Sequence, residues 1–366
     1  MRMAVSPSGK HMKIGFIGNG WRTRGYWRIV RQVPEEFQIS GVLFRDPAKA
    51  AAFTEAPAFT DLTEFLQQDH DMIMILIPRK VVFPYIEACV SAGFPVLVET
   101  PPAPDVEGLV KVWELQQKYN AKIQVAEQYF LQPYHSAVRA LCEQGILGDV
   151  HNLRIAMAHD YHGISVMRKL LGVGDQSCTI TAKRFDVPVL YHCGRAGMED
   201  PRMVTDHRKV ADFVFENGKV GFFDFADEQY FNYFRSRHMQ VQGTQGEIND
   251  YQVSWWNGTM PMCARLERQD LGQDSNLEGY FHRGISFNGE MVYTSPFAQY
   301  TEARLTDDEI SMGSLLLGMD RLIRTGEEIY PLKEALQDTY LYLMMDEAIR
   351  TGQSVQTKQM PWNQGL

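Results

Sequence analysis

The sequence has few of the features that mark secreted, membrane-bound or nucleic-acid-binding proteins. Its five cysteines are scattered without C-x-x-C spacing, so neither a zinc site nor a disulfide framework is indicated, and we expect no bound metal. No apolar run is long enough to span a bilayer, and no basic-then-apolar signal peptide precedes the first strand, which predicts a cytoplasmic protein without a membrane partner. Acidic residues outnumber basic ones by 45 to 36, and the net charge of −9 argues against a nucleic-acid partner.

The sequence does contain enough apolar material for two domains. Its 366 residues are too many for one ordinary core, and 45% of them are hydrophobic. Residues 1–12 show no periodicity and resemble an expression-vector remnant, so they are left out of the fold. We predict one domain over residues 13–130 and a second over residues 131–366, whose terminal helices could pack back on the first.

The first domain shows a regular alternation of strand and helix patterns. Apolar runs predict strands, and segments with a helical pattern follow each of the first four. The predicted strands cover residues 14–17, 39–44, 72–77, 95–99 and 123–128, and the predicted helices cover residues 23–33, 48–56, 82–92 and 106–119. This order is typical of βαβ units, so we expect an α/β fold with a parallel, Rossmann-type sheet.

A glycine-rich turn connects the first predicted strand to the first predicted helix. Gly18 can turn sharply away from the strand, and Gly20 lacks the Cβ that would keep a pyrophosphate from the backbone. The start of the helix then presents N–H groups and a positive dipole end to the phosphates. Thr23 occupies the third glycine position of the G-x-G-x-x-G pattern. The turn predicts a dinucleotide site.

The second half of the chain has a different pattern. Strands are predicted over residues 152–158, 178–184, 209–216, 220–226 and 238–242, and helices over residues 133–144, 164–171, 311–325 and 332–351. The pair Asn217 and Gly218 indicates a hairpin. We therefore expect an α+β domain with an open, mostly antiparallel sheet. Residues 270–301 are polar and are predicted to form an irregular excursion near the site or at a subunit contact.

Five short motifs follow one another along the chain in an order that is typical of one protein family. They are VLVETP at 96–101, EQGILGDV at 143–150, FENG at 215–218, GTQG at 243–246 and GQSV at 352–355. With the glycine-rich turn, they resemble the Gfo/Idh/MocA family of glucose–fructose oxidoreductases, inositol dehydrogenases and rhizopine-catabolism proteins. The resemblance implies NAD or NADP as cofactor, a sugar or cyclitol held between that cofactor and the open sheet, and a homodimer or homotetramer.

The turn and the resemblance together imply a set of cofactor-binding residues. An acid that binds the ribose of NAD is expected at the end of the second strand, where this chain has Phe44. Arg45 could pair with the 2′-phosphate of NADP, while Asp46 could reach the ribose, so the sequence leans slightly toward NADP without settling the choice. The residues expected at the cofactor are Gly18, Gly20, Trp21, Arg22, Phe44, Arg45, Pro78, Glu99 and Thr100.

The departures from the family pattern concern the chemistry. The family carries Glu-Lys-Pro where this chain has Glu99, Thr100 and Pro101, and it places an aspartate where this chain has Ala158. His162 stands at the family spacing before Gly172, so it is the predicted general base, with a structural histidine as the alternative.

Other polar and aromatic residues are candidates for the same site. Glu127 and Tyr129 follow the last predicted strand of the first domain, at the edge where α/β sheets bind ligands, and are further catalytic candidates. Arg79 and Lys80 could contact the cofactor or substitute for the missing lysine, and the favoured alternative is a solvated loop pair. One of Trp255 and Trp256 could stack on a sugar, because neighbours on a strand point opposite ways.

These observations favour one function over two alternatives. The main hypothesis is an NAD(P)-dependent oxidoreductase that acts on a hydroxyl of a sugar, glycoside or cyclitol. The first alternative is an NAD-dependent glycosidase that works by transient oxidation and elimination, since the relatives of that kind also lack the lysine and carry a glutamate near Glu127. The second is a protein that binds dinucleotide and sugar without turnover.

Overall fold

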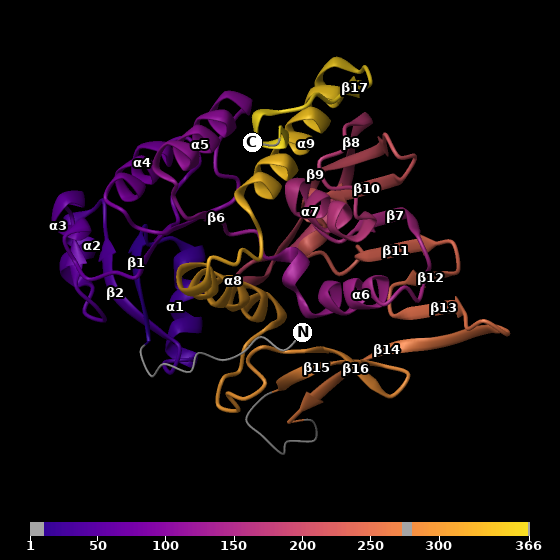
Figure 1. Cartoon of the computed structure of the whole chain (residues 1–366), viewed down its shortest axis with the longest axis horizontal. Helices are drawn as coiled ribbons and strands as arrows, with labels where there is room; N and C mark the ends of the chain where they lie inside the picture. Colours follow the sequence, from indigo (N-terminus) through magenta and orange to yellow (C-terminus); the bar gives the residue numbers. More distant parts are fainter. Residues whose placement is uncertain (1–10, 273–279, 365–366) are drawn as a thin grey trace. The chain divides into compact units, whose positions relative to one another are not determined.

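The computed structural model describes residues 11–272 and 280–364, which form two compact units (Figure 1). Of the described residues, the first unit comprises 11–133, 269–272, 280–284 and 294–336, and the second comprises 134–268, 285–293 and 337–364. Both units are therefore built from separate stretches of the chain. The remnant expected at residues 1–12 lies mostly outside the described residues, and the first strand already begins at Met12.

The first unit contains a six-stranded parallel sheet in the order β3-β2-β1-β4-β5-β6. Its strands are β1 (Met12–Ile17), β2 (Phe37–Leu43), β3 (Ala58–Phe59), β4 (Met72–Ile75), β5 (Val96–Val98) and β6 (Ile123–Val125). The connecting helices are α1 (Trp21–Gln32), α2 (Pro47–Ala52), α3 (Leu62–Leu66), α4 (Phe83–Ser91) and α5 (Val106–Tyr119). This is the doubly wound order of a Rossmann domain, so the predicted fold class is confirmed.

The differences from the predicted elements are local. The strands predicted over residues 72–77, 95–99 and 123–128 end two, one and three residues earlier, because the residues beyond them leave the ladder at the carboxyl edge of the sheet. The short elements β3 and α3 were not predicted, since two and five residues are too few for a periodic pattern.

A buried histidine, which the sequence analysis did not single out, packs against two glycines of this sheet. His70 is 7% exposed. A Cβ added to Gly15 would lie 3.0 Å from its ring, and a Cβ added to Gly41 would lie 3.2 Å from it. The ring nitrogens lie 2.6 Å from the Ser40 hydroxyl and 3.0 Å from the Phe65 carbonyl oxygen. Burial lowers the pKa of His70, and the two glycines explain how an imidazole fits beneath the strands.

Helix α8 (Asp307–Thr325) belongs to the first unit and packs against α1. It begins four residues before the predicted start at residue 311. The reason is a capping box, in which the Thr306 hydroxyl accepts a hydrogen bond from the Glu309 amide while the Glu309 carboxylate accepts one from the Thr306 amide. Glu309 also forms an ion pair with Arg28 of α1.

The second unit is built on a larger sheet. The eleven strands of this sheet follow the order β16-β15-β14-β13-β12-β11-β7-β10-β9-β8-β17. They are β7 (Val150–Ala156), β8 (Cys178–Gly194), β9 (Gly197–Phe215), β10 (Val220–Ala226), β11 (His238–Gly243), β12 (Gly246–Asn249), β13 (Gln252–Trp256), β14 (Pro261–Leu271), β15 (Phe281–Phe287), β16 (Glu290–Thr294) and β17 (Val355–Gln356).

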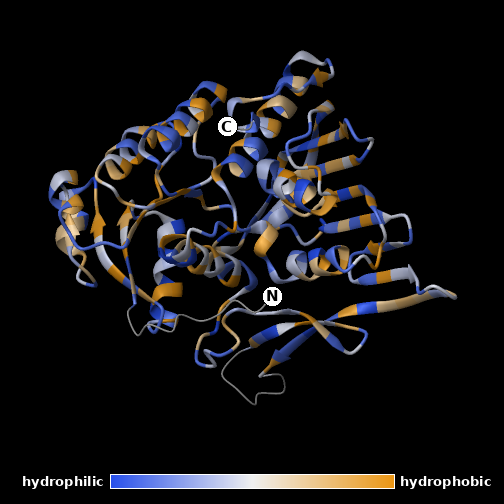
Figure 2. Cartoon of the chain, viewed as in Figure 1, coloured by the Kyte–Doolittle hydropathy of each residue, from blue (hydrophilic) through white to orange (hydrophobic). Residues whose placement is uncertain are grey.

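Within the described residues, most strand pairs of this sheet are antiparallel, and β7 and β10 are parallel, so the expected mostly antiparallel sheet is confirmed. The helices that follow or precede these strands are α6 (Pro133–Glu143), α7 (Asp160–Leu171) and α9 (Leu332–Thr351). Helix α7 packs on β7 and β10. Buried and more exposed residues alternate along β10 and β11, as expected when one face is covered, and Figure 2 shows hydrophobic and hydrophilic residues interspersed along the strands of this sheet.

Two predictions for this half need correction. Strands β8 and β9 have 17 and 19 residues, far more than predicted. The prediction was too short because residues 186–206 carry no hydrophobic alternation; in the structure they pair only with each other. The segment 270–301, predicted to be irregular, contains β15 and β16, with Ile285 and Phe287 buried among polar neighbours. Residues 273–279 of that segment lie outside the described residues. In the described parts of the chain, no helix is long and apolar enough to cross a bilayer.

Candidate functional site

The glycine-rich turn has the geometry of a phosphate cradle. Gly18 follows β1 with φ +107°, and a Cβ there would lie 2.5 Å from the Leu76 carbonyl oxygen, so a side chain is excluded. Gly20 is the N-cap of α1 and supplies no side-chain cap, and a Cβ on it would meet nothing within 4 Å. The first turn of α1 contains no acidic residue. This arrangement fits a bound pyrophosphate, which needs space and helix N–H groups.

Arg22, the next charged residue of the turn, is directed at carboxylates of its own unit. Its side chain is 12% exposed, and its Nε lies 3.4 Å from Glu99 Oε1. Its Nη1 lies 3.5 Å from Asp308 Oδ2 at the start of α8. Burial by itself would lower the pKa of Arg22, but the neighbouring carboxylates raise it above its usual value. Arg22 is therefore a fixed cation within the unit.

Glu99 and Glu127 complete what we call the Arg22 cluster, defined as Arg22, Glu99, Glu127 and Asp308. Burial raises the pKa of Glu99 to about 7, with Arg22 opposing the shift and Glu127 adding to it. Glu127 is 2% exposed, and its Oε1 accepts a hydrogen bond of 2.9 Å from the amide of half-buried Tyr129. The structure thus groups four predicted site residues, Arg22, Glu99, Glu127 and Tyr129, but it buries Glu127.

The end of β2 offers two charged side chains, Arg45 and Asp46, for the ribose side of a cofactor. Phe44 is 4% exposed and packs on Phe53 at 5.3 Å between ring centroids, so its side chain supplies no polar contact. Asp46 is the N-cap of α2 and accepts a hydrogen bond of 3.0 Å from the Ala48 amide. Arg45 is exposed between them.

The remaining predicted cofactor residues lie around the same carboxyl edge of the sheet. Pro78, Arg79 and Lys80 are exposed in the turn after β4, and Thr100 is half-buried after β5. Trp21 is 54% exposed at the first position of α1, with the Arg22 guanidinium 5.3 Å from its ring centroid. An exposed indole beside the glycine turn can stack on a planar ligand.

In the second unit, His162 lies in the first turn of α7. It is 5% exposed, and its ring centroid lies 4.7 Å from that of His159 and 4.4 Å from that of Tyr161. Ala158, which stands where the resemblance implies an aspartate, is also buried. His162 is thus enclosed by aromatic neighbours.

A second ionic group surrounds the start of α7, and we call it the Lys209 cluster, defined as His159, Asp160, Lys209 and Asp346. Lys209 Nζ lies 2.9 Å from Asp160 Oδ1 and 2.8 Å from Asp346 Oδ1. His159 Nδ1 lies 3.5 Å from Asp160 Oδ2. Burial works to raise the pKa of Asp160, but the contacts with His159 and Lys209 lower it to about 2. The sequence analysis missed Lys209 and Asp160.

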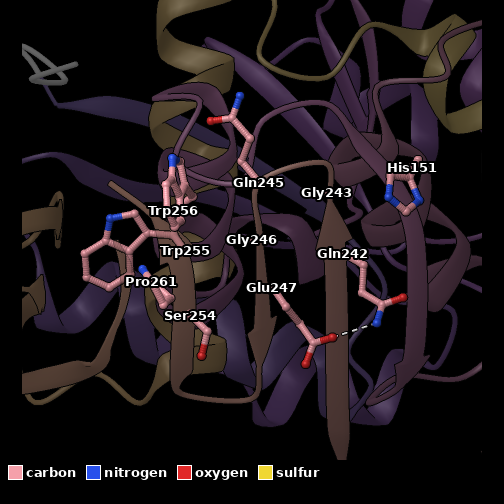
Figure 3. Close-up of a pocket in the computed structure, with 10 residues that line it drawn as sticks. All are labelled: His151, Gln242, Gly243, Gln245, Gly246, Glu247, Ser254, Trp255, Trp256 and Pro261. Carbon is pink, nitrogen blue, oxygen red and sulfur yellow. Dashed lines mark hydrogen bonds between the residues drawn. The ribbon is translucent and has the colours of Figure 1, made fainter. Parts of the chain in front are cut away.

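A hollow in the second unit is lined by none of the predicted catalytic residues. It has a volume of about 510 Å³ and lies over β11, β12 and β13 (Figure 3). Both Trp255 and Trp256 border it, whereas only one was expected to face a ligand; β13 ends at Trp256, where the strand gives way to a turn. Within the described residues, no group of three or more His, Cys, Asp or Glu side chains could hold a metal ion.

Comparison with known proteins agrees with the geometry of the first unit. Residues 12–127 match the family model described as an oxidoreductase family with an NAD-binding Rossmann fold. This part of the chain is a Rossmann domain that is similar to the NAD-binding domain of that family. The matched residues include the glycine-rich turn and the Arg22, Glu99 and Glu127 positions.

Curated relatives resemble only part of the chain. An inositol 2-dehydrogenase of Corynebacterium glutamicum (strain R) is 30% identical over 151 residues, which is 40% of this chain and 45% of that protein. The chain therefore spans less than half the length of that relative.

Solved structures extend the likeness in fold to nearly the whole chain. An oxidoreductase of Agrobacterium radiobacter in complex with NAD+ has a TM-score of 0.68 at 15% identity and covers 95% of this chain and 98% of its own. A levoglucosan dehydrogenase in complex with NADH has a TM-score of 0.67 at 16% identity, covering 96% and 100%. At these identities the comparison establishes the fold, including the second unit.

Proposed function

We propose that the chain is an NAD(P)-dependent oxidoreductase of the Gfo/Idh/MocA type that acts on a hydroxyl of a sugar or cyclitol. The observation that carries the proposal is the glycine turn between β1 and α1, whose open Gly20 and uncapped helix start fit a dinucleotide. The family match of residues 12–127 and the resemblance to an inositol 2-dehydrogenase support the reaction class.

The residues of the first unit would hold the cofactor. Gly18 and Gly20 would admit the pyrophosphate, and Arg45, next to Asp46, would be the cation at the ribose end. When bound, a nicotinamide dinucleotide supplies the hydride acceptor or donor of such a reaction. The chain itself must provide the proton acceptor for the substrate hydroxyl.

The first experiment tests the turn. Gly20→Val fills open space and so should leave the fold intact, yet it places two methyl groups where a pyrophosphate must approach. We expect the dissociation constants of NADH and NADPH, measured by nicotinamide fluorescence, to rise at least about tenfold. Gly20→Ala should give a smaller rise. Binding within about twofold of wild type in Gly20→Val, with an unchanged melting temperature, would contradict the site.

The second experiment tests cofactor choice. If Arg45 contacts a 2′-phosphate, Arg45→Ala removes a charge-assisted hydrogen bond that only NADP makes. We therefore expect weaker NADPH binding with little change for NADH. Arg24→Ala, another exposed arginine of the same unit, is the control. Equal losses for the two cofactors would remove Arg45 from the ribose site.

The third experiment separates the three candidate functions. The protein is assayed with NAD and NADP against cyclitols, free sugars and aryl glycosides, following both reduced cofactor and released aglycone. Accumulated NAD(P)H supports a dehydrogenase, and aglycone without NAD(P)H supports the glycosidase. Cofactor binding with neither product supports a non-catalytic role.

Thr100→Lys sharpens the same comparison. In a dehydrogenase limited by the missing lysine, the substitution should raise oxidation of free sugars or cyclitols, because it returns a cationic side chain to that position. In a glycosidase whose site has adapted to a neutral residue, it should lower aglycone release. A faster aglycone release without NAD(P)H would contradict the dehydrogenase.

A further inference from the structure

We propose that His159, oriented by Asp160 and anchored through Lys209, is the proton acceptor of this protein, in place of His162. The proposal deepens the proposed function and rests on it for the reaction class. It assigns a residue that the family spacing does not indicate.

Exposure separates the two histidines. The His159 side chain is 39% exposed, so a hydroxyl group can reach its ring. His162 is 5% exposed and packs against the rings of His159 and Tyr161. A general base must come within hydrogen-bond reach of the proton that it removes. Only His159 meets this condition without a rearrangement of α7.

Tyr230 and the start of α7 hold His159 in place. The His159 amide donates a hydrogen bond of 3.1 Å to the Tyr230 hydroxyl oxygen. The ring of Tyr230 lies edge-to-face against the imidazole, with centroids 5.6 Å apart at an interplanar angle of 89°. His159 is also the N-cap residue of α7, so its backbone is held at the start of a helix.

Asp160 gives the imidazole its direction. Its Oδ2 lies 3.5 Å from His159 Nδ1, a position that favours the proton on Nδ1 and leaves the Nε2 lone pair as the base. Asp160 adopts φ +45°, a left-handed conformation that is uncommon for a residue with a side chain. A strained backbone conformation of this kind persists where the surrounding structure holds the residue in place. Here both carboxylate oxygens of Asp160 have partners.

Lys209 holds Asp160 in place. Its ammonium group bridges Asp160 on α7 and Asp346 on α9, with Nζ–O distances of 2.9 and 2.8 Å, and lies 5.3 Å from the Tyr342 ring centroid. Two carboxylates keep this lysine charged, so it cannot itself accept a proton. Lys209 and Asp160 are therefore positioning residues, and His159 is the group that would touch the substrate.

The step balances with the proposed reaction. The O–H bond of the substrate alcohol breaks and its proton passes to His159 Nε2, which becomes an imidazolium. The oxygen electron pair forms the carbonyl bond as the hydride leaves the same carbon for the nicotinamide cofactor of the proposed function. Reduction would run the same transfers in reverse.

A second histidine–carboxylate pair provides a matched control. His207 is also 39% exposed, and its Nδ1 lies 2.9 Å from Asp186 Oδ1. That carboxylate is 49% exposed and shared with Arg184, on the stretch of β8 and β9 where the strands pair only with each other. His207 thus matches His159 in residue type, exposure and partner type, but its carboxylate is more exposed than Asp160 and is held by an arginine of its own strand instead of by a lysine that bridges two carboxylates.

The first test needs no substrate. Long-range ¹H–¹⁵N spectra of histidine-labelled protein report which ring nitrogen carries the proton, and the signals of His159 are those missing from His159→Gln. We expect the neutral ring to be mainly the Nδ1–H form, and to lose this preference in Asp160→Asn and in Lys209→Met. A mainly Nε2–H ring in the wild type, or a ring unaffected by Asp160→Asn, would overturn the proposal.

The second test measures turnover of myo-inositol, scyllo-inositol, D-glucose and levoglucosan with NAD and NADP. We expect His159→Gln to lower kcat by roughly a hundredfold with little change in cofactor affinity, and His207→Gln to stay within about twofold of wild type. Retained kcat in His159→Gln, with a large loss in His162→Gln, would overturn the assignment. If the wild type converts none of these compounds, the proposed function fails for them, while the tautomer still decides the His159–Asp160 pair.

Discussion

Each unit of the molecule holds a cation between two carboxylates, yet the acids respond in opposite ways. In the Arg22 cluster the pKa of Glu99 is raised to about 7. In the Lys209 cluster the pKa of Asp160 is lowered to about 2. Both carboxylates belong to partly exposed side chains, 23% for Glu99 and 24% for Asp160, so exposure does not explain the difference.

Distance and the number of nearby acids explain it instead. The ammonium of Lys209 lies 2.8 and 2.9 Å from its partners, whereas the Arg22 contacts are 3.4 and 3.5 Å. Glu127 adds a further negative charge near Glu99, while His159 adds a second favourable contact to Asp160. A salt bridge therefore does not by itself keep a carboxylate ionised; the balance of all neighbours decides.

The largest expected effect is loss of the cation in the first unit. Arg22→Gln leaves Glu99, Glu127 and Asp308 together without their positive neighbour, and should destabilise the protein by about 3 kcal/mol. Lys209→Gln leaves only two partly exposed carboxylates and should cost about 2 kcal/mol. Urea unfolding followed by tryptophan fluorescence gives both values. A larger loss in Lys209→Gln would reverse the comparison.

The second prediction uses opposite pH windows. Because the folded state raises the pKa of Glu99, the contribution of this group to stability is full below about pH 4.5 and is lost as the pH rises to about 7. The lowered pKa of Asp160 gives a contribution present above about pH 3.8 and lost as the pH falls toward about 2.

Two substitutions measure these windows. The stability of wild type relative to Glu99→Gln should fall between about pH 5 and 8, and that of wild type relative to Asp160→Asn should fall between about pH 4 and 2. Unfolding free energies across the two ranges provide the measurement. If both stability differences changed with pH in the same direction, the folded state would not shift the pKa values of Glu99 and Asp160 in opposite directions.

The smallest expected effect isolates the third acid. Glu127→Gln removes a negative charge that raises the pKa of Glu99. The pH range over which the Glu99 contribution to stability is lost should therefore move to lower pH by less than about one unit. The same pH series, repeated in the Glu127→Gln background, measures the shift. Glu107→Gln, an exposed glutamate on α5, should leave the window unchanged. A shift to higher pH would contradict the electrostatic account.

Local patterns explain how much of this molecule could be predicted. The strands and helices of the Rossmann sheet were predictable because apolar runs and glycine turns are short-range signals, and Gly18 and Gly20 were found in this way. The partner of Arg22 on α8 was not, because Asp308 lies 286 residues further along the chain. His162 could be chosen as a candidate from its spacing, but its burial could not be predicted, since the burial of a side chain depends on the packing of the whole second unit.

Lys209 did leave a signal in the sequence. In β9 the residues at positions 211, 213 and 215 are Ala, Phe and Phe, and all three are buried, so Lys209 occupies the apolar phase of the strand. A lysine in that phase predicts an internal counter-ion. Its partners Asp160 and Asp346 lie 49 and 137 residues away, which is why the sequence could not name them.

The interleaved make-up of the two units constrains how the chain can fold during synthesis. The face of α1 that packs on α8 stays uncovered until residues 307–325 leave the ribosome, and β8 gains its edge partner β17 only with residues 355–356. The chain therefore cannot complete one domain after another from the amino terminus onward. Both units must wait for its last third, and a fragment cut after the Rossmann strands would expose the apolar side of α1.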